Sequence, residues 1–389
     1  MIIRFPLVFC TLCAILGIVV GYLFPSVWFI PATFIALVIA TIIRQRDVLS
    51  VMMMVVFWIL LGASRIYLSL QDAPTSTFGE TFRTLQIKAE KKAYFLIDRL
   101  ESSGLDDESL ALSSALILGR KDMLSWERRH QFSEAGASHL LALSGLHMGI
   151  LYGVLYLLMV RWFRHSRWNW FILPPVLLII WGYTLIAGMS TSLIRASIML
   201  SILTICSLDE RHTSSIHVLA LSALIMLMLD PGCIFDIGFQ LSYLAVLFIL
   251  LIYVPLSPFL VIFGHSILSR INSMLLVSFS AQLGTAPLCM YYFHTFPILS
   301  AFVSLLLIPL TTLIIYGALL LLIWPSNILA TGLNIIIRLE DGIVEQWIKI
   351  PGTTIHDLHP NLWSVVLIYA LMFTVILRFM GRSKDIISR

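Results

Sequence analysis

The sequence of 389 residues has few charged side chains, since Asp, Glu, Lys and Arg make up only 12% of it and hydrophobic residues make up 59%. The mean hydropathy is +0.96, and a soluble domain of this length has no core large enough to bury so much apolar surface. We therefore predict a membrane protein that crosses the bilayer several times. The net charge of +4 says little about partners, because Lys and Arg beside membrane spans follow orientation.

Cysteine and catalytic signatures are also scarce. Five cysteines are present, and Cys10 and Cys13 form a CxxC inside an apolar run, where a redox site would lack water and an activating cation. The sequence has no HExxH, no Walker A loop and no clustered metal carboxylates. A serine hydrolase built on Ser144 and His147 is set aside, because i, i+3 residues of one helix rarely meet as nucleophile and base. We expect no enzymatic activity, no catalytic residue, no metal and no cofactor.

Apolar windows long enough to cross about 30 Å of hydrocarbon occur eleven times. They lie at residues 5–24, 27–43, 49–70, 138–160, 170–188, 190–208, 212–230, 238–254, 272–293, 297–323 and 362–380. The predicted fold class is therefore all-α, a polytopic transmembrane helix bundle of about eleven spans. Pro309 can break the tenth window into two half-helices. The charges within residues 328–349 favour an amphipathic helix on the membrane surface instead of a span.

Basic residues set the predicted orientation, because Lys and Arg concentrate in cytoplasmic loops. If the N-terminus is inside, one side of the membrane collects Arg44, Arg46, Arg161, Arg164, Arg167, Arg211 and Arg270. The short loops on the opposite side have neither Lys nor Arg, and residues 71–137 fall on that outer side. The side of the C-terminus stays open, since Arg378, Arg382 and Lys384 favour the cytoplasm while an odd number of spans places the end outside.

Residues 71–137 differ from the rest, because they hold 20 of the 46 charged side chains. Apolar residues at steps of three and four from Phe78 to Leu100 predict an amphipathic helix. Asp106 to Glu108 can cap a second helix, and Gly136 can end a third that follows Ser125. We predict three parts: N-terminal transmembrane spans in 1–70, a short extracytoplasmic amphipathic helical segment in 71–137 and a transmembrane domain in 138–389.

Polar side chains within the apolar windows are costly and therefore mark the candidate site. They are His139, Ser144, His147, Arg195, Asp236, Gln240 and Gln282. Arg195 needs a partner in the outer half of the bundle, and Asp236 is the best that the sequence offers. A structural ion pair and a hydrated path for an anion both stay open for these two residues, as an interhelical hydrogen bond does for the histidines.

Three glycines share a face of the helix that follows Ser144. Gly145, Gly149 and Gly153 repeat at i, i+4 and i+8, which clears that face for the close approach of a neighbouring backbone. We therefore predict that the three glycines serve helix packing.

Several stretches, in order over about residues 110–380, resemble the membrane core of the ComEC competence family. Residues 115–120 read ALILGR and residues 139–147 read HLLALSGLH, which is similar to the HLLAxSGLH signature of that family. Arg195-Ala196, the stretch from Asp236 to Ser242 that contains GFQLS, residues 281–287 and Pro309 resemble its later motifs. The resemblance implies a multi-pass channel component of the bacterial inner (cytoplasmic) membrane that conducts single-stranded DNA into the cytoplasm during natural transformation, with 138–389 as its competence-type channel domain.

The chain departs from that family pattern in two places. Residues 71–137 are too short for the extracytoplasmic OB-like domain of many members, and the sequence His356-Asp357-Leu358-His359 does not fit the HxHxDH motif of their metallo-β-lactamase-like domain. We therefore expect a separate nuclease to degrade the second strand. The expected partners are single-stranded DNA, membrane lipids, other competence proteins that include this nuclease and a cytoplasmic motor, and, as an option left open, a homo-oligomer.

Two functions of other classes remain open from the sequence. The Arg195 cluster suits a transporter or flippase for a small or lipid-linked anion equally well. The chain can also be a structural membrane subunit with no transport of its own. Host competence, the energy source and the identity of the nuclease are not set by the sequence.

Overall fold

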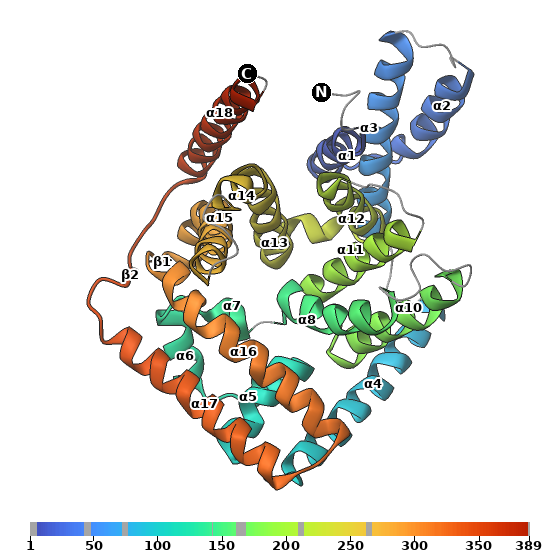
Figure 1. Ribbon diagram of the computed structural model, residues 1–389. Coiled ribbons are helices and arrows are strands. Elements are labelled where there is room, and N and C mark those ends of the chain that lie inside the picture. The colour runs from blue at the N-terminus through green and yellow to red at the C-terminus, as the bar shows by residue number, and fades with distance from the viewer. Residues whose placement is uncertain are drawn as a thin grey trace. The chain divides into compact units, whose positions relative to one another are not determined.

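The protein is described by a computed structural model over residues 6–42, 48–71, 77–141, 143–160, 169–208, 214–261 and 267–387. These residues are almost entirely helical (Figure 1), which confirms the predicted all-α class. Of the residues used for orientation, Arg44, Arg46, Arg161, Arg164, Arg167 and Arg211 lie outside the described ranges. The orientation stays a prediction.

The chain divides into two compact units. Unit 1 comprises Met1–Leu85, Leu157–Leu177 and Ile194–Tyr243, and unit 2 comprises Gln86–Tyr156, Leu178–Leu193 and Leu244–Arg389. In chain order the elements are α1 (Pro6–Leu23), α2 (Phe29–Ile42), α3 (Val48–Gln71), α4 (Thr77–Glu101), α5 (Asp107–Leu118), η1 (Lys121–Met123), α6 (Trp126–Glu134), α7 (Ser138–Leu141), α8 (Gly145–Leu155), η2 (Tyr156–Val160), α10 (Asn169–Ile186), α11 (Thr191–Leu208), α12 (Ser215–Leu229), η3 (Pro231–Phe235), α13 (Ile237–Phe248), η4 (Ile249–Tyr253), α14 (Val254–Val261), α15 (Ile267–Phe293), β1 (Phe296–Pro297), α16 (Ser300–Ile323), α17 (Asn327–Ile348), β2 (Thr354–Ile355) and α18 (Leu362–Ile387). The predicted boundaries after residues 70 and 137 stay predictions.

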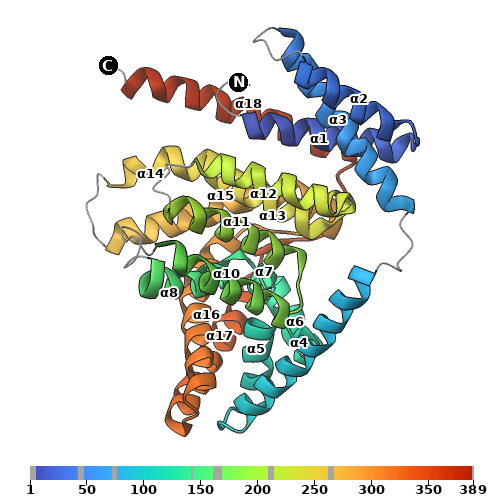
Figure 2. The same ribbon diagram turned by 90° about the vertical axis from the view of Figure 1, so that its right-hand side faces the viewer.

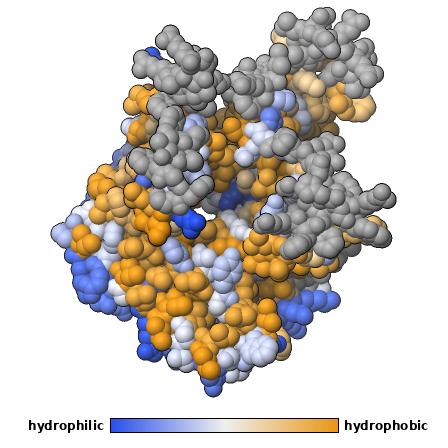
Figure 3. Space-filling model, in the orientation of Figure 1, coloured by the Kyte–Doolittle hydropathy of each residue, from blue (hydrophilic) through white to orange (hydrophobic). Residues whose placement is uncertain are grey.

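Five described helices are long and apolar enough to cross a membrane. They are Pro6–Leu23, Met52–Leu70, Ile237–Ser257, Ile267–Phe293 and Ser300–Ile323, and several shorter apolar helices accompany them. Large apolar side chains are also exposed along many of these helices, and Figure 3 shows them as orange areas on the surface. Exposed apolar side chains at this density fit an all-α membrane bundle in which lipid covers the helices. The number of eleven spans stays a prediction.

Unit 1 is built around a close contact between α1 and α3, which cross each other in Figure 2. Gly17 of α1 lies so near the Ile59 carbonyl that a Cβ has no room, and Gly62 of α3 lies in the same way against the Ala14 carbonyl. Gly21, one helical turn after Gly17, faces the backbone of α3 at Ala63. Small residues four apart let two membrane helices approach backbone to backbone, so these glycines set the α1–α3 contact.

The glycines for which this packing role was predicted behave differently. A Cβ added at Gly149 or Gly153 would meet no heavy atom of the described residues within 4 Å. No described residue packs closely on these two positions, and the packing role of Gly145, Gly149 and Gly153 stays a prediction. The same spacing of small residues occurs in α1, at Gly17 and Gly21.

Unit 2 has a core that joins the charged segment to two long helices near the C-terminus. The predicted amphipathic helix is present as α4, which buries Ala89, Ala93, Ile97 and Leu100. Ile97 and Leu100 pack with residues of α5, α6, α16 and α17 in one hydrophobic cluster, and α16 and α17 run side by side in Figure 1. The amphipathic faces of α4 and α17 are thus buried against protein on one side, as their apolar periodicity requires.

The helix ends predicted in this segment are confirmed. Asp106 accepts a hydrogen bond from the Ser109 amide at the start of α5, and Ser125 accepts one from the Arg128 amide at the start of α6. Gly136 follows the end of α6 with φ of 76°, a left-handed conformation that favours glycine.

Pro309 does not break the tenth window, contrary to the prediction. Helix α16 runs continuously from Ser300 to Ile323 with Pro309 inside it. The helix buries one face against the core of unit 2, and this packing outweighs the one backbone hydrogen bond that proline removes.

Two acidic residues of α17 enter the core of unit 2. Asp341 forms a short two-pronged ion pair with Arg128 of α6. Glu340 is 1% exposed; its Oε1 accepts a hydrogen bond from the Thr311 hydroxyl at 2.6 Å, and its Oε2 is buried with no hydrogen-bond partner among the described residues. Burial raises the pKa of Glu340 to about 7 although the Thr311 bond opposes the shift.

The only strands among the described residues form a small antiparallel pair in unit 2. Phe296 of β1 is opposite Ile355 of β2, and Pro297 is opposite Thr354. Beyond β1, the Ile298 amide donates to the Thr353 carbonyl, and the Thr354 hydroxyl donates to the carbonyl of Glu134 at the end of α6. The pair therefore ties the link between α15 and α16 to the segment that precedes α18.

Glycines of α1 and α8 should respond in opposite ways to alanine. We expect Gly17→Ala to destabilise the purified protein by about 1–3 kcal/mol, because the new methyl group meets a backbone carbonyl. Gly149→Ala is the matched control and should be neutral or stabilising by up to about 1 kcal/mol, since alanine favours a helix and nothing obstructs it. Thermal unfolding in detergent measures both, and equal effects would contradict the α1–α3 contact.

Glu340 should make stability depend on pH. Its folded-state pKa lies above the ordinary glutamate value, so its stabilising contribution is full below about pH 4.3 and is lost as the pH rises through 7. We expect the free energy of unfolding to fall over this range by roughly 3 kcal/mol at most. Glu340→Gln should flatten this dependence, whereas Glu345→Gln, at an exposed position on the same helix, should keep it. Unfolding curves at several pH values test this, and an unchanged slope in Glu340→Gln would refute it.

Candidate functional site

The window predicted as a single span over residues 138–160 is divided. It contains α7, which ends at Leu141, and α8, which begins at Gly145. Ser144 between them has an extended backbone, with φ of −124° and ψ of 174°, and its hydroxyl accepts a hydrogen bond from the Leu146 amide. Such a residue is an N-cap, which supplies an acceptor to amides that have no partner in the first helical turn. The polar Ser144 thus starts a new helix within an apolar segment.

His147 completes this helix start. Its Nδ1 lies 3.3 Å from the Ser144 amide nitrogen and 3.1 Å from the Ser144 hydroxyl, which makes a capping box. The side chain is 1% exposed, and its Nε2 is buried with no hydrogen-bond partner among the described residues. The two side chains therefore do meet, although i, i+3 residues were expected to meet rarely, and their contact caps a helix.

His139 is held apart from that box on the short helix α7. It is exposed, and its Nε2 lies 3.5 Å from the hydroxyl of Ser304 in α16. The turn before α7 fits against the start of α16, where a Cβ on Gly136 would come within 2.6 Å of Pro297 and 2.8 Å of Ser300. Gly136 is therefore needed both for its left-handed backbone and for this close contact.

Arg195 belongs to unit 1, where it is 5% exposed in the first half of α11. Its guanidinium lies 5.6 Å from the centre of the Tyr243 ring, a cation–π contact. The Tyr243 hydroxyl is 3.2 Å from that of Ser222 in α12. Tyr243 is thus a partner of Arg195 that the sequence reasoning missed. The predicted ion pair of Arg195 with Asp236 stays a prediction.

Asp236 and Gln240 organise the turn before α13. A carboxylate oxygen of Asp236 accepts a hydrogen bond from the Phe239 amide at 3.1 Å, as an N-cap does. The Gln240 side-chain amide donates to the Ile234 carbonyl at 2.9 Å. Both side chains therefore supply hydrogen-bond partners to backbone groups at the junction of η3 and α13.

Gln282 has a similar role in unit 2. Its side-chain amide donates to the carbonyl of Pro297, the last residue of β1, and to that of Ile298, the next residue. The carboxamide thus holds the link between α15 and α16 on the side of α15. Gln282 was expected to supply a donor within a span, and this donor is used by the chain's own backbone.

A cavity of about 750 Å³ with polar groups in its walls lies within unit 2. It is lined by Glu90, Ala93, Leu118, Gly119, Arg120, Lys121, Asp122, Leu143, Leu185, Ile186, Ala187, Gly188, Ser190, Thr191 and Ser192. Four separate stretches of sequence meet here: α4, the end of α5 with η1, Leu143 before the capping box, and the end of α10 with the start of α11. Two of the motifs singled out in the sequence therefore belong to one place.

Gly119 makes this convergence sterically possible. It ends α5 in a left-handed conformation with φ of 73°. A Cβ there would lie 2.6 Å from the Leu143 side chain and 3.0 Å from the Ala187 carbonyl. The Tyr183 hydroxyl also donates to the Ile117 carbonyl at 2.9 Å, which fastens α10 to the end of α5.

Arg120 occupies the wall of the cavity in a fixed position. Its guanidinium donates to Asp122 at 3.0 and 2.8 Å and to the Tyr94 hydroxyl at 2.7 Å, and Glu90 lies 3.9 Å away. The Arg120 hydrogen bonds hold the pKa of Asp122 below its ordinary value. Lys121, the next residue, is exposed at the same wall. The cavity therefore offers two cations, one already paired.

The start of α11 also lines this cavity. The Leu193 amide donates to the Ser190 hydroxyl at 3.4 Å, so Ser190 caps this helix. Thr191 and Ser192 add further hydroxyls, and Gly188 and Met189 turn the chain with φ of 86° and 49°. Two cations and three hydroxyls around a cavity of this size can bind an anion such as a phosphate group. Arg120 could have been found from ALILGR, but only the fold places Ser190 beside it.

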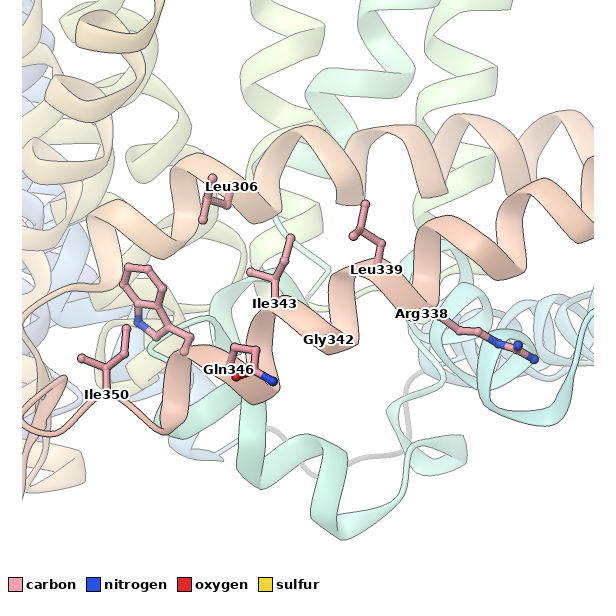
Figure 4. Close-up of a pocket in the computed structure, with 8 residues that line it drawn as sticks. Leu306, Arg338, Leu339, Gly342, Ile343, Gln346 and Ile350 are labelled. Atoms are coloured by element: carbon pink, nitrogen blue, oxygen red, sulfur yellow. The ribbon is translucent and has the colours of Figure 1, made fainter.

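A second pocket, of about 390 Å³ between α16 and α17, has a different character (Figure 4). Its walls are mainly the apolar side chains of Leu306, Leu339, Ile343, Trp347 and Ile350. The cation at its edge, Arg338, is bonded to Asp106 at 2.9 Å. This pocket therefore lacks the polar groups that recognise an anion.

Known proteins match the part of the chain that contains the motifs described above. The family model described as Competence protein matches residues 116–382. ComE operon protein 3 of Bacillus subtilis (strain 168) is 29% identical over 299 residues, which cover 74% of this chain and 36% of that protein. Recombination protein 2 of Haemophilus influenzae (strain ATCC 51907 / DSM 11121 / KW20 / Rd) is 29% identical over 171 residues, 42% of this chain and 22% of that protein.

An uncharacterised protein of Aquifex aeolicus (strain VF5) is 28% identical over 224 residues, 57% of this chain and 49% of that protein. The chain thus matches less than half the length of each of these relatives. No solved structure matches the chain.

The capping box predicts which substitutions the helix start tolerates. We expect Ser144→Ala to destabilise the protein by about 0.5–2 kcal/mol, because the Leu146 amide loses its acceptor. Ser144→Asn keeps an acceptor and His147→Gln keeps a capping-box side chain, so both should stay close to the wild type in thermal unfolding. If Ser144→Asn were as damaging as Ser144→Ala, the cap would not be the role of this serine.

Proposed function

We propose that this chain, which belongs to the Competence protein family, conducts single-stranded DNA into the cytoplasm across the bacterial cytoplasmic membrane during natural transformation. The observation that carries the proposal is the polar cavity of unit 2. Arg120 and Lys121 line it together with Ser190, Thr191 and Ser192, which carry hydroxyls. The motif segments on which the family resemblance rests contribute to its walls.

The chemistry of the cavity suits a nucleic-acid backbone. Single-stranded DNA carries one negative charge per nucleotide and needs cations and hydrogen-bond donors to replace its hydration in a membrane. Arg120 and Lys121 supply the charge, and the three hydroxyls supply donors without charge. The first turn of α11 adds partial positive charge near the same hydroxyls.

The acidic residues of the cavity limit how tightly a strand is held. Asp122 and Glu90 already engage Arg120, so a phosphate must compete with them for the guanidinium. A conduit requires binding that is favourable enough for entry and weak enough for release. Walls that carry both acidic and basic residues therefore suit a strand that passes through better than one that stays tightly bound.

In this proposal, some of the polar residues named from the sequence contact the DNA strand, and the others hold the ends of helices. His139, on the exposed side of α7, is available to a strand. Ser144, Asp236, Gln240 and Gln282 keep the breaks between helices in place. Arg195 is proposed as a further cation for the path in unit 1.

The proposed partners follow from the same function. We infer that single-stranded DNA is the substrate, that lipids surround the apolar helices, and that other competence proteins act with the chain. A separate nuclease would degrade the second strand and a cytoplasmic motor would draw the first one in. The chain itself is proposed to have no enzymatic activity, and purified protein should show no metal-dependent nuclease activity.

One alternative uses the same cavity. A transporter or flippase for a small or lipid-linked anion would also need Arg120, Lys121 and the hydroxyls at the start of α11. Family membership favours DNA, because the motifs that line the cavity are those of the competence resemblance. Uptake of a small anion by proteoliposomes distinguishes the two.

Deleting the gene in a naturally transformable host that carries it should abolish chromosomal transformation. Labelled DNA should still bind to the cell surface, but nuclease-resistant uptake should be lost, because binding precedes passage through the membrane. Normal transformation of the deletion strain would overturn the proposal.

Point variants test the cavity separately. Lys121→Glu should lower transformation by about tenfold or more through repulsion of phosphates. Arg129→Glu is the matched control, since it makes the same change of charge at an exposed residue outside the cavity. The amount of membrane-inserted protein should be equal for both. If the two variants transform equally well, the cavity is not part of the path of the DNA strand.

A further inference from the structure

Two histidines meet at the end of the small β1–β2 pair, outside the cavity described above. His294 follows α15, and His359 lies between β2 and α18. The Leu358 amide donates to the His294 carbonyl at 3.0 Å, and the β1–β2 pairing continues from there. Backbone hydrogen bonds thus join the segments that carry His294 and His359 over several residues, which restrains the positions of the two histidines.

The imidazole nitrogens of this pair converge. The Nδ1 atoms of His294 and His359 are 3.1 Å apart, and the ring centroids are 4.3 Å apart. The Leu358 carbonyl oxygen lies 3.0 Å from the same Nδ1 of His294. Both histidines are exposed, so an ion can reach them from solution.

We propose that His294 and His359 bind one divalent transition-metal ion through their Nδ1 atoms. Zinc lies 2.0–2.1 Å from a histidine nitrogen, and two nitrogens 3.1 Å apart then form an angle of about 100° at the metal, between octahedral and tetrahedral values. Ideal rings on such an ion have centroids about 4.8 Å apart, so the rings need to open by about half an ångström. Leu358 offers a carbonyl oxygen beside them, and water fills the remaining positions.

The backbone at the pair adopts an uncommon conformation. Three non-glycine residues among those described have a positive φ, namely Met189, His294 and Asp357. His294, with φ of 57°, belongs to the pair, and Asp357, with φ of 60°, lies two residues before His359. Such conformations are sparsely populated and cluster at ligand sites.

The number and type of ligands determine the affinity of the site and the metal that it prefers. No group of three or more His, Cys, Asp or Glu residues in the described part of the chain is placed to hold an ion. The site has two side-chain ligands and should bind reversibly. Imidazole suits copper, nickel and zinc, with copper bound most strongly.

A bound ion would have a mechanical effect on unit 2. It would link the segment after α15 to the segment before α18. Helix α18 already contacts α15, because the Tyr369 hydroxyl of α18 donates to the Gly284 carbonyl of α15 at 2.9 Å. The metal would therefore stabilise the position of α18 on α15. This role is independent of whether the chain carries DNA.

The test uses the full-length protein, purified in detergent through a tag without histidine and stripped with a chelator. Zn²⁺ is titrated by calorimetry, and Cu²⁺ is followed by electron paramagnetic resonance. We expect one ion per chain with two nitrogen ligands. His359→Ala and His294→Asn should each weaken binding by about 10- to 100-fold, as even loss of an outer partner does. Asparagine is chosen at position 294 because it tolerates positive φ.

His356→Ala is the matched control, because it removes a histidine of the same loop that is outside the pair. It should bind the ion as the wild type does, and Zn²⁺ should raise the unfolding temperature of both. The proposal is overturned if wild-type protein binds neither ion, if the copper spectrum shows fewer than two nitrogens, or if His356→Ala weakens binding as much as the pair variants. The spectrum of the wild type decides the question even if a variant fails to fold.

Discussion

The constraint on which this structure depends is that backbone groups at helix ends need partners in a chain with very little polar surface. Water satisfies such groups in soluble proteins, but apolar surroundings leave that task to side chains. Ser144 and Asp236 supply acceptors to the amides that begin α8 and α13. Arg65 donates to the carbonyls of Met228 and Leu229 at the end of α12. The scarce polar residues thus fix where the helices start and stop.

This constraint changes how a polar residue in an apolar segment is interpreted. Ser144, His147, Asp236, Gln240 and Gln282 all bond to backbone or to each other, so their presence is explained by structure before any ligand is considered. Arg120, Lys121 and the hydroxyls at the start of α11 differ, because they surround a cavity. Function is therefore better sought where polar side chains face a hollow than where they lie at membrane depth.

Several features could be predicted from the sequence because their causes are local. Helix α4 follows from apolar residues at steps of three and four, and the caps at Asp106 and Ser125 follow from side chains that bond three residues ahead. The capping box of Ser144 and His147 was not predicted, although its spacing of three is present in the sequence. The break between α7 and α8 was missed, since a long apolar window hides it. The packing role of the α8 glycines stays a prediction, because close packing needs a neighbour as well as a spacing.

The sequence by itself determined an apolar, all-α membrane protein with a competence signature, because composition and short motifs record local chemistry. Only the tertiary structure decided that Gly119, Leu143 and Ala187 meet, that Arg195 lies over Tyr243, and that His294 reaches His359. These contacts join residues from 24 to 68 positions apart along the printed sequence. Contacts at that range depend on how whole helices pack, and the free energy of that packing is spread over many side chains, none of which specifies it alone.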